Sequence, residues 1–518
     1  MPVRDRLVPP FQGGALWGWL SPILVAVFGA LLRFDRLGTP KAVEFDETFY
    51  AKDALSLLRY GVERTFLGTD KDPIADRRLI AGRDDLWVSC TPDNLDPCAQ
   101  YVAHPPLGKW MIGVGEWLFG ANPFGWRFAA ALVGAVSILV LARLARRMTR
   151  STLLGCMAGL LLALDGLHFV LSRTALLDVF LMFWVLCGFA CLVVDRDRSR
   201  ERLADWYETS PLSDGGPWLG MRPWRIAAGA CLGAACATKW SGIFFLVAFA
   251  VMSLVWDAGA RRAVGLRRPF SGMFRHDVPT SLVAVAAVPA LTYTVSWTGW
   301  FATAYGYGRN WAQATSSGWV YWVFSSARSW IDYQLQVLTF HTGLEQTHPY
   351  QSWPWQWPLL LRPVAFYYQS PKGCGAASCS QATLGVGTPV IWYGALVALI
   401  ALIAWYVAAR DWRAGAVLLA YGVGWLPWVY YAIADHRTMF LFYMAPVVPF
   451  MILALTLAAG LLIGPSRVTG SRRAVGAAVT GAFVLLSIAN FAWLHPALTA
   501  ELIPYDDWYR RMLLRSWI

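Results

Sequence analysis

Charged side chains are scarce in this sequence of 518 residues. They make up 15% of the chain, whereas hydrophobic residues make up 57%; soluble domains contain roughly 25% and 45–50%, respectively. Nine cysteines in 518 residues exclude a small disulfide scaffold, and the apolar content excludes a disordered chain. No Walker loop, dinucleotide-binding glycine pattern or HExxH motif is present, so nucleotide and zinc-hydrolase chemistry have no motif. The composition predicts a polytopic α-helical membrane protein.

Eleven apolar segments are candidates to cross a hydrocarbon core about 30 Å thick. The first runs from Leu7 to Leu32 without a charged residue and ends before Arg33. We interpret it as a retained anchor rather than a signal peptide, because it is long and lacks a small-residue cleavage site. The other ten lie near residues 122–142, 152–166, 176–194, 226–239, 241–256, 279–297, 388–409, 415–433, 438–463 and 474–494.

Arginines predict the orientation of these segments. With a cytoplasmic N-terminus, every loop that returns to the cytoplasm is rich in Arg, as the positive-inside rule requires. The net charge of +12 is therefore a topology signal and does not indicate nucleic acid binding. The predicted divisions are the N-terminus with span one (1–33), a first extracytoplasmic loop (34–121), spans two to seven (122–297), a second extracytoplasmic loop (298–387), spans eight to eleven (388–494) and an extracytoplasmic tail (495–518).

Two close pairs of cysteines fall in the predicted outer loops. Cys90 and Cys98 lie in the first, and Cys374 and Cys379 lie in the second. In an oxidising compartment such pairs predict two local disulfide bonds. A zinc site is the alternative, but His partners at ligand spacing are missing.

Ionisable residues gather near the outer ends of the predicted spans. Charges at membrane depth are costly, so those that are retained usually have a function. A carboxylate can act as a general base, and Arg and Lys can bind phosphate, which favours a phosphate-linked lipid substrate that arrives from the bilayer. The residues concerned are Asp46, Glu47, His104, Lys109, Asp165, His168, Arg173, Asp178, Lys239, Asp435, His436 and Arg437.

A series of short motifs, each weak alone, resembles the protein O-mannosyltransferases of the glycosyltransferase C (GT-C) superfamily in its order along the chain. The C-terminal stretch from Trp508 to Ile518 looks like the actinobacterial branch. Residues 298–387 are too few for the β-trefoil MIR domain that eukaryotic relatives carry after span seven. The motifs are Phe45-Asp46-Glu47-Thr48-Phe49-Tyr50, His104-Pro105-Pro106-Leu107-Gly108-Lys109, Arg173-Thr174-Ala175-Leu176-Leu177-Asp178, Thr238-Lys239-Trp240-Ser241-Gly242, Phe340-His341, His348-Pro349-Tyr350 and Trp357-Pro358.

The resemblance implies an all-α GT-C fold with about 11 transmembrane helices and two large extracytoplasmic segments that contain interfacial helices. It implies a plasma-membrane enzyme that transfers mannose from polyprenyl-phosphate-mannose to Ser or Thr hydroxyls on the extracytoplasmic face. The acceptors would be unfolded secreted or membrane proteins, and the Sec translocon is a further candidate partner. Nucleic acid is not expected as a partner.

Asp46 matches the family's catalytic carboxylate, and the resemblance implies that it is the general base of an inverting single displacement. Its structural alternative is a helix cap. Glu47 matches the second acidic position and would orient the acceptor or a cation; a solvated contact with Lys52 is the alternative. We expect no obligatory metal, and a divalent ion on Asp46 and Glu47 is the open alternative.

Arg127 matches a family arginine near the donor site. We expect it to bind the donor phosphate, with snorkelling to the interface as the alternative. Further phosphate candidates are Lys239, Arg437 and Arg173, although Arg173 is also expected to pair with Asp178. The candidate acceptor-binding residues are His104, His348 and Trp353.

Two other functions stay open at this point. A GT-C enzyme could move another sugar, such as arabinose, to a glycan or a lipid, with the same fold and mechanism. A transporter or lipid flippase would carry out no chemistry. Trp353 belongs to the Trp-rich stretch 351–358, which would line an open groove beside Asp46 if the acceptor is a peptide.

Overall fold

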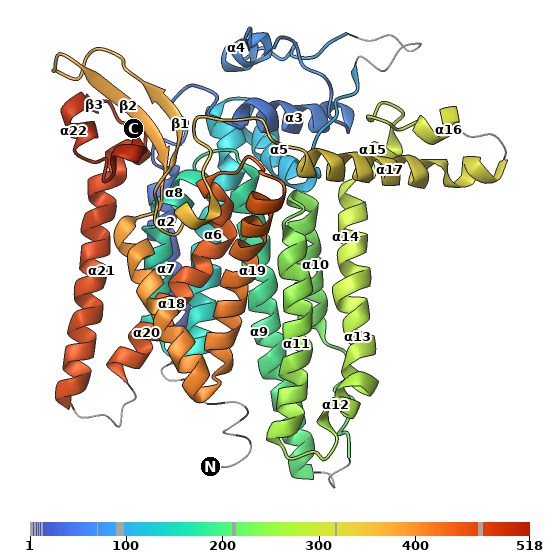
Figure 1. The fold of residues 1–518 in the computed structure, drawn as a ribbon, viewed down its shortest axis with the longest axis vertical. Coiled ribbons are helices and arrows are strands. Elements are labelled where there is room, and N and C mark those ends of the chain that lie inside the picture. Colours follow the sequence, from blue (N-terminus) through green and yellow to red (C-terminus); the bar gives the residue numbers. More distant parts are fainter. Residues whose placement is uncertain are drawn as a thin grey trace.

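The computed structural model describes residues 4, 7, 9, 11, 14–69, 71–89, 98–209, 214–315, 319–464 and 470–518. Within these residues, nine helical segments are long and apolar enough to cross a membrane, and they run side by side (Figure 1). The chain is therefore a multi-pass helical membrane protein. The segments are α2 (Trp17–Phe34), α6 (Pro123–Thr149), α9 (Leu177–Thr209), α11 (Gly242–Ala263), α12 to α14 (Pro269–Ser296), α18 (Pro389–Ala409), α19 (Trp412–Ala434), η5 with α20 (Leu441–Ile463) and α21 (Gly470–Leu498).

The predicted count of eleven spans is not confirmed, because two of the expected segments form shorter helices. α7 (Thr152–Ala163) has 12 residues and α10 (Pro223–Thr238) has 16. α10 ends where Lys239 adopts an extended backbone, and that turn directs the lysine to the outer end of the bundle. The first span begins at Trp17, ten residues later than Leu7, after a stretch rich in proline and glycine.

The two predicted outer loops cover the same end of the bundle. α3 (Glu47–Tyr60) and α17 (Trp319–Thr342) lie across this end (Figure 1). α5 (Leu107–Phe119) packs against both α3 and α6. The shorter α4 (Ile74–Ile80), α8 (Gly166–Leu171), α15 (Thr298–Ala302), α16 (Trp311–Thr315) and α22 (Tyr505–Tyr509) complete the described helices of this end.

A small antiparallel sheet, which the all-α prediction missed, joins the second outer loop to the C-terminal tail. Its order is β1 (Val364–Gln369), β2 (Cys379–Gly385) and β3 (Ile503–Pro504). β2 pairs with β3 at Cys379 and Pro504. No local pattern in the sequence indicates this pairing, because the two strands are more than a hundred residues apart.

Disulfide bonds occur in both outer loops. Cys374 and Cys379 form one, which closes the hairpin between β1 and β2. Cys98 is also disulfide-bonded. Cys90 lies outside the described residues.

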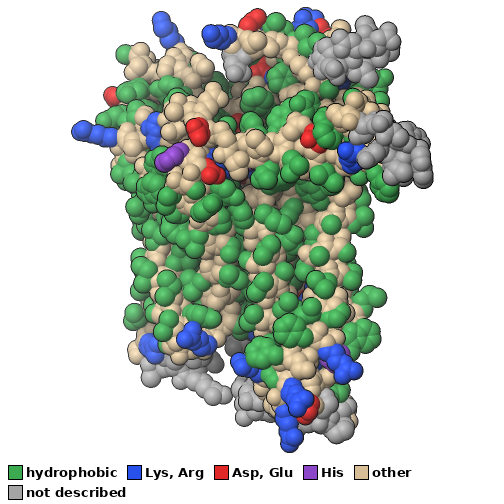
Figure 2. Space-filling view, turned by 45° about the vertical axis from the view of Figure 1, so that its right-hand side comes forward, with side chains coloured by type: hydrophobic (Ala, Val, Ile, Leu, Met, Phe, Trp, Pro, Cys, Tyr) green, Lys and Arg blue, Asp and Glu red, His purple; other side chains and the backbone are tan. Residues whose placement is uncertain are grey.

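The surface of the bundle shows where lipid would surround it. Figure 2 shows a broad belt of hydrophobic side chains between the two ends. Lys and Arg predominate among the charged side chains at the lower end, whereas the upper end carries both signs. At the lower end, buried Arg222 donates to Asp195 at 2.6 Å and to Asp257 at 2.9 Å, so one guanidinium links α9, α10 and α11.

α10 also approaches the helical segment Pro269–Ser296 closely. A Cβ atom on Gly229 would lie 1.7 Å from the carbonyl oxygen of Ala284, so this contact requires glycine. The contact sets the position of α10, and therefore of Lys239 at its end.

We predict that Gly229→Ala lowers the free energy of unfolding by about 1–3 kcal/mol, because the added methyl group forces the two helices apart. Gly259→Ala is the matched control, since a Cβ there meets no atom within 4 Å. Thermal unfolding of both variants in detergent checks this. Equal shifts in the two variants would show that the α10 contact has no special role.

Candidate active site

Asp46 immediately precedes α3 and faces a cavity. Its carboxylate makes no capping hydrogen bond to the helix, so the helix-cap interpretation has no contact to support it. The cavity has a volume of about 640 Å³ and lies between α3, the segment before α5, the end of α17 and the loop after α19. Its polar lining includes Asp46, Tyr50, Asp53, His104, His348 and Arg437.

The residue before Asp46 holds an uncommon backbone conformation. Phe45 has φ of 49°, which is costly for a bulky side chain. Its ring packs against His348, Phe366 and Phe440, with centroids 5.3–5.7 Å apart. These contacts hold the turn that leads from the end of α2 into α3 and presents Asp46 to the cavity.

The surroundings of Asp46 suit a general base. Burial raises the pKa of Asp46 to about 6, while the charge of Lys239 and the hydroxyl of Tyr50 favour the ionised form. The carboxylate is therefore ionised at neutral pH and still basic enough to accept a proton.

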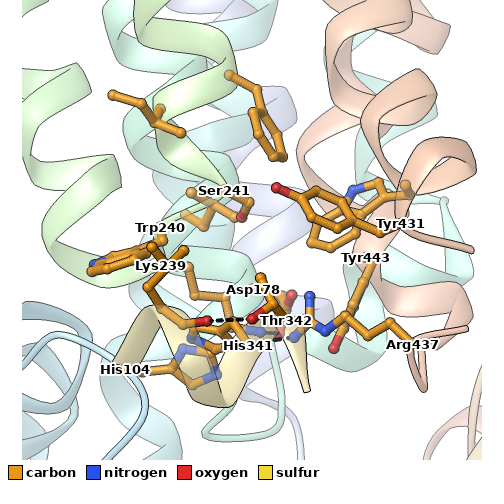
Figure 3. A pocket seen from close by; sticks show the side chains of 15 residues that line it. His104, Asp178, Lys239, Trp240, Ser241, His341, Thr342, Tyr431, Arg437 and Tyr443 are labelled. Atoms are coloured by element: carbon orange, nitrogen blue, oxygen red, sulfur yellow. Dashed lines mark hydrogen bonds and ion pairs between the residues drawn. The ribbon is translucent and has the colours of Figure 1, made fainter. Parts of the chain in front are cut away.

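A second, apolar cavity of about 230 Å³ adjoins the first. Its walls include Leu181, Ile243, Phe244 and Trp428, which come from α9, α11 and α19. Figure 3 shows the polar residues converging at one end of this cavity. The residues that line both cavities are His104, His341, Arg437 and Tyr443.

Lys239 and Asp178 form a buried ion pair in the apolar cavity. The ammonium nitrogen of Lys239 lies 2.8 Å from a carboxylate oxygen of Asp178 (Figure 3). The expected pair between Arg173 and Asp178 is therefore wrong. Lys239 comes closer to Asp178 because α10 ends beside the first turn of α9.

Arg437 has no carboxylate partner within the part of the chain that the structure describes. Its Nη2 lies 3.2 Å from Nδ1 of His341, and its Nε is buried without a hydrogen bond. Burial and the charge of Arg437 lower the pKa of His341 to about 4, so the imidazole is neutral. Nε2 of His341 donates to the carbonyl of Ala103 at 2.9 Å, which leaves Nδ1 to accept from Arg437.

Glu47 and Arg127 lie outside both cavities and form a buried ion pair. Arg127 donates to both carboxylate oxygens of Glu47, at 2.8 and 2.9 Å. The same guanidinium donates to the carbonyls of Pro40 and Ala42, at 3.0 and 2.9 Å. Both side chains are fully buried. A phosphate would have to displace these partners, so the geometry favours a structural role for Arg127 over the expected phosphate contact.

The other sequence-derived candidates separate into two groups. Arg173 donates to the carbonyls of Arg33 at 2.8 Å and Asp35 at 2.6 Å, so it caps the end of α2 outside both cavities. Trp353 stacks on Trp355 at 5.4 Å and lines a separate pocket near Arg362 rather than the cavity beside Asp46. His104 and His348 both line the larger cavity.

Lys52 contacts Asp76 at 2.6 Å, not Glu47. Asp53 and Tyr443 were not predicted from the sequence as site residues, and Tyr50 and His341 stood only within its motifs. Tyr50 and Asp53 follow Asp46 by four and seven residues, so helical spacing would have found them once α3 was known to be a helix.

Among the described residues, the site offers two carboxylates whose pKa burial raises, Asp46 and Asp53, one guanidinium without a carboxylate partner, and an adjoining apolar cavity. This set can remove a proton from a hydroxyl and stabilise a departing phosphate. Among the described residues, no group of three or more His, Cys, Asp and Glu is arranged to hold a metal ion.

Comparisons with known proteins match nearly the whole chain. The family model "Dolichyl-phosphate-mannose-protein mannosyltransferase" matches residues 23–298, and "C-terminal four TMM region of protein-O-mannosyltransferase" matches residues 326–517. A Mycolicibacterium smegmatis protein named polyprenol-phosphate-mannose–protein mannosyltransferase is 38% identical, over 99% of this chain and 96% of its own.

The chain belongs to the protein O-mannosyltransferase family.

A relative of the same name from Mycobacterium tuberculosis is 39% identical over 99% of this chain and 94% of its own. Among solved structures, the S. cerevisiae protein O-mannosyltransferase Pmt1-Pmt2 complex bound to the sugar donor superposes with a TM-score of 0.73. That match covers 98% of this chain and 93% of the yeast chain at 15% identity. It shows that the fold of this O-mannosyltransferase family member is the GT-C fold.

We predict that Arg127→Met lowers the free energy of unfolding by about 3–5 kcal/mol, because the buried carboxylates of Glu47 and Glu44 lose their cation and Glu47 keeps only two backbone N–H donors among the described residues. The double variant Glu47→Gln/Arg127→Met should recover part of this loss. Arg77→Met is the control, since its pair with Asp72 is more than half exposed and contributes at most about 1 kcal/mol. Thermal unfolding in detergent checks all three.

If Arg127→Met were as stable as the wild type but no longer bound polyprenyl phosphate, Arg127 would be a phosphate ligand, and its ion pair with Glu47 would not be needed for stability.

Proposed function

We propose that this protein transfers mannose from polyprenyl-phosphate-mannose to a Ser or Thr hydroxyl of a protein. The observation that carries the proposal is that Asp46 and Arg437, which has no carboxylate partner among the described residues, line one cavity that adjoins an apolar cavity. A transporter needs neither a general base nor a phosphate site at that junction. The full-length similarity to relatives named for this reaction supports the same conclusion.

The donor binds across the two cavities. Its lipid chain lies along Ile243, Phe244 and Trp428, which offer an apolar surface. Its phosphate lies at the junction, where Arg437 donates two hydrogen bonds and Lys239 adds a second positive charge. Lys239 is already neutralised by Asp178, so Arg437 is the stronger phosphate contact.

Asp46 is the general base. The acceptor hydroxyl enters the larger cavity, and Asp46 takes its proton as the oxygen attacks C1 of mannose. The bond between C1 and the phosphate oxygen breaks at the same time, and polyprenyl phosphate leaves with both electrons. Arg437 and Lys239 stabilise its negative charge. A single displacement of this kind inverts the configuration at C1. Arg437 carries most of the charge stabilisation of the leaving phosphate, because Lys239 is paired with Asp178, and we expect no obligatory metal.

The reaction takes place on the extracytoplasmic face of the plasma membrane. The lower end of the bundle, opposite the cavities, is the one where Lys and Arg predominate among charged side chains (Figure 2). The positive-inside rule makes that end cytoplasmic and places the N-terminus there. Acceptors therefore meet the enzyme as unfolded chains during export.

The decisive test is a transfer assay with the purified protein, polyprenyl-phosphate-mannose and a Thr-containing peptide. We expect mannosyl-peptide from the wild type and a turnover reduced about 10²–10⁴-fold in Asp46→Asn, which removes the base but keeps the shape. Asp85→Asn, an exposed aspartate in the same outer loop, should retain wild-type turnover.

Donor binding by Asp46→Asn should stay within a few fold of the wild type, because the phosphate contacts are intact. Full turnover by Asp46→Asn would refute the assignment of the base. Absence of product from the wild type would refute the proposed activity itself.

The raised pKa of Asp46 predicts a pH dependence. Only the ionised carboxylate accepts the proton, so turnover should fall as the pH drops below about 6, approaching tenfold per pH unit. The donor phosphodiester keeps its negative charge over this range, so its contact with Arg437 should not change, and rates measured at saturating donor report the base. Rates measured between about pH 5 and pH 8 check this, and a flat profile would show that Asp46 does not act as the base.

A further inference from the structure

Asp53 is a second carboxylate of the larger cavity, and the mechanism above does not use it. It lies two helical turns after Asp46 on the same face of α3, with Tyr50 between them. Seven residues of helix separate the two carboxylates by about 10 Å along the helix axis. Asp53 is therefore too far along α3 to share the proton transfer at Asp46.

The local contacts leave half of the Asp53 carboxylate without a partner. The side chain is 3% exposed, and its Oδ2 lies 3.8 Å from the ammonium of Lys109. Lys109 makes its short hydrogen bond to Glu63 instead. Within the described residues, Oδ1 of Asp53 has no hydrogen-bond partner. A buried polar atom without a partner is destabilising by about 1–3 kcal/mol, so such an atom needs an explanation.

Two further buried atoms without partners lie on the segment before α5. They are Oε1 of Gln100 and Nδ1 of His104, and both side chains line the same cavity as Asp53. Water can occupy these positions in the free protein, but a ligand that replaces the water must supply matching hydrogen bonds. Asp53 and Gln100 present oxygen acceptors and Lys109 presents a donor, a set that suits a molecule with several hydroxyl groups.

The position of these atoms favours the sugar over the lipid and the peptide. A phosphate at Arg437 lies on the wall that both cavities share, so the group attached to it extends into the larger cavity. The rings of Tyr101 and Phe340, with centroids 6.0 Å apart, line this cavity and offer an apolar surface for the C–H face of a sugar ring. A lipid chain would leave the polar atoms without partners.

We propose that Asp53, Gln100 and His104 form the subsite that binds the hydroxyl groups of the transferred sugar, with Asp53 as its principal contact. The inference rests on the proposed function, because it takes the donor phosphate to lie at Arg437. Asp53 is then a specificity-determining residue: it binds the sugar of the donor and takes no part in the proton transfer.

The experiment compares two ligands, polyprenyl-phosphate-mannose and bare polyprenyl phosphate, in binding to the full-length protein in detergent. We expect the wild type to bind the mannosylated carrier more tightly than the bare one. At about pH 8, above the pKa of about 7 to which burial raises Asp53, Asp53→Asn should weaken binding of the mannosylated carrier about ten- to hundredfold, because a hydrogen bond to a charged group is lost. Binding of the bare carrier should change less than about twofold, since Arg437 and Lys239 are intact.

Glu63→Gln is the matched control. Both Glu63→Gln and Asp53→Asn change the ionic contacts of Lys109. Glu63, however, does not line the cavity. The ratio of the two affinities should therefore keep its wild-type value in this variant. Gln100→Leu is a second test that removes no charge, and we expect it to lower the ratio about three- to tenfold.

Three results with the variants would overturn the inference: an equal loss for both carriers in Asp53→Asn, an equal fall of the affinity ratio in Glu63→Gln, or a rise in the peptide KM alone when Asp53→Asn is run in the transfer assay. The first two would make Asp53 structural, and the third would assign it to the acceptor. The same holds if the wild type binds both carriers equally. The binding measurements need no turnover, so a failed transfer assay would refute the proposed activity, whereas an unchanged affinity ratio in Asp53→Asn would refute the sugar subsite alone.

Discussion

The bidentate ion pair between Glu47 and Arg127 is the contact on which the rest of the active site depends. Glu47 belongs to the first turn of α3 and Arg127 to α6, so the pair fixes α3 to a membrane-spanning helix. The remaining donors of Arg127 hold the carbonyls of the segment that leads from α2 to α3. Because both side chains are fully buried, neither can leave without exposing an unpaired charge to the interior. Asp46 is thereby held at the edge of the cavity by its own neighbour in the sequence.

Three of the cations at or near the cavities differ in the partners that they already have. Arg127 is saturated by carboxylate and carbonyl oxygens, and Lys239 is neutralised by Asp178. Arg437 contacts a neutral imidazole and aromatic rings, with its cation 5.6 Å from the centre of the Trp428 ring. A buried guanidinium in such a setting gains most from an anionic ligand. The division separates cations that build the site from the one that is available to a phosphate.

Much of the fold follows from local sequence. Each predicted apolar segment contains a helix, because the lack of water in a bilayer forces an apolar run to satisfy its own backbone. The short lengths of α7 and α10 and the presence of the small sheet could not be predicted from local sequence. α10 ends at Lys239 because that residue turns toward a partner on α9, and β3 exists only because β2 lies beside it. Both depend on contacts between distant segments, which no periodicity records.

The sequence by itself determined the class of protein, and it predicts the sides of the membrane and the residue types at the candidate active site. These properties depend on hydrophobicity and charge, which each segment carries independently of its neighbours. The tertiary structure alone decided the partners: Arg127 contacts Glu47, Arg173 contacts backbone carbonyls, Asp178 pairs with Lys239, and Asp53 shares a cavity with Asp46. The physical reason is that a charge acts through partners within about 4 Å, and which partners come that close is fixed only when helices from distant parts of the chain pack together.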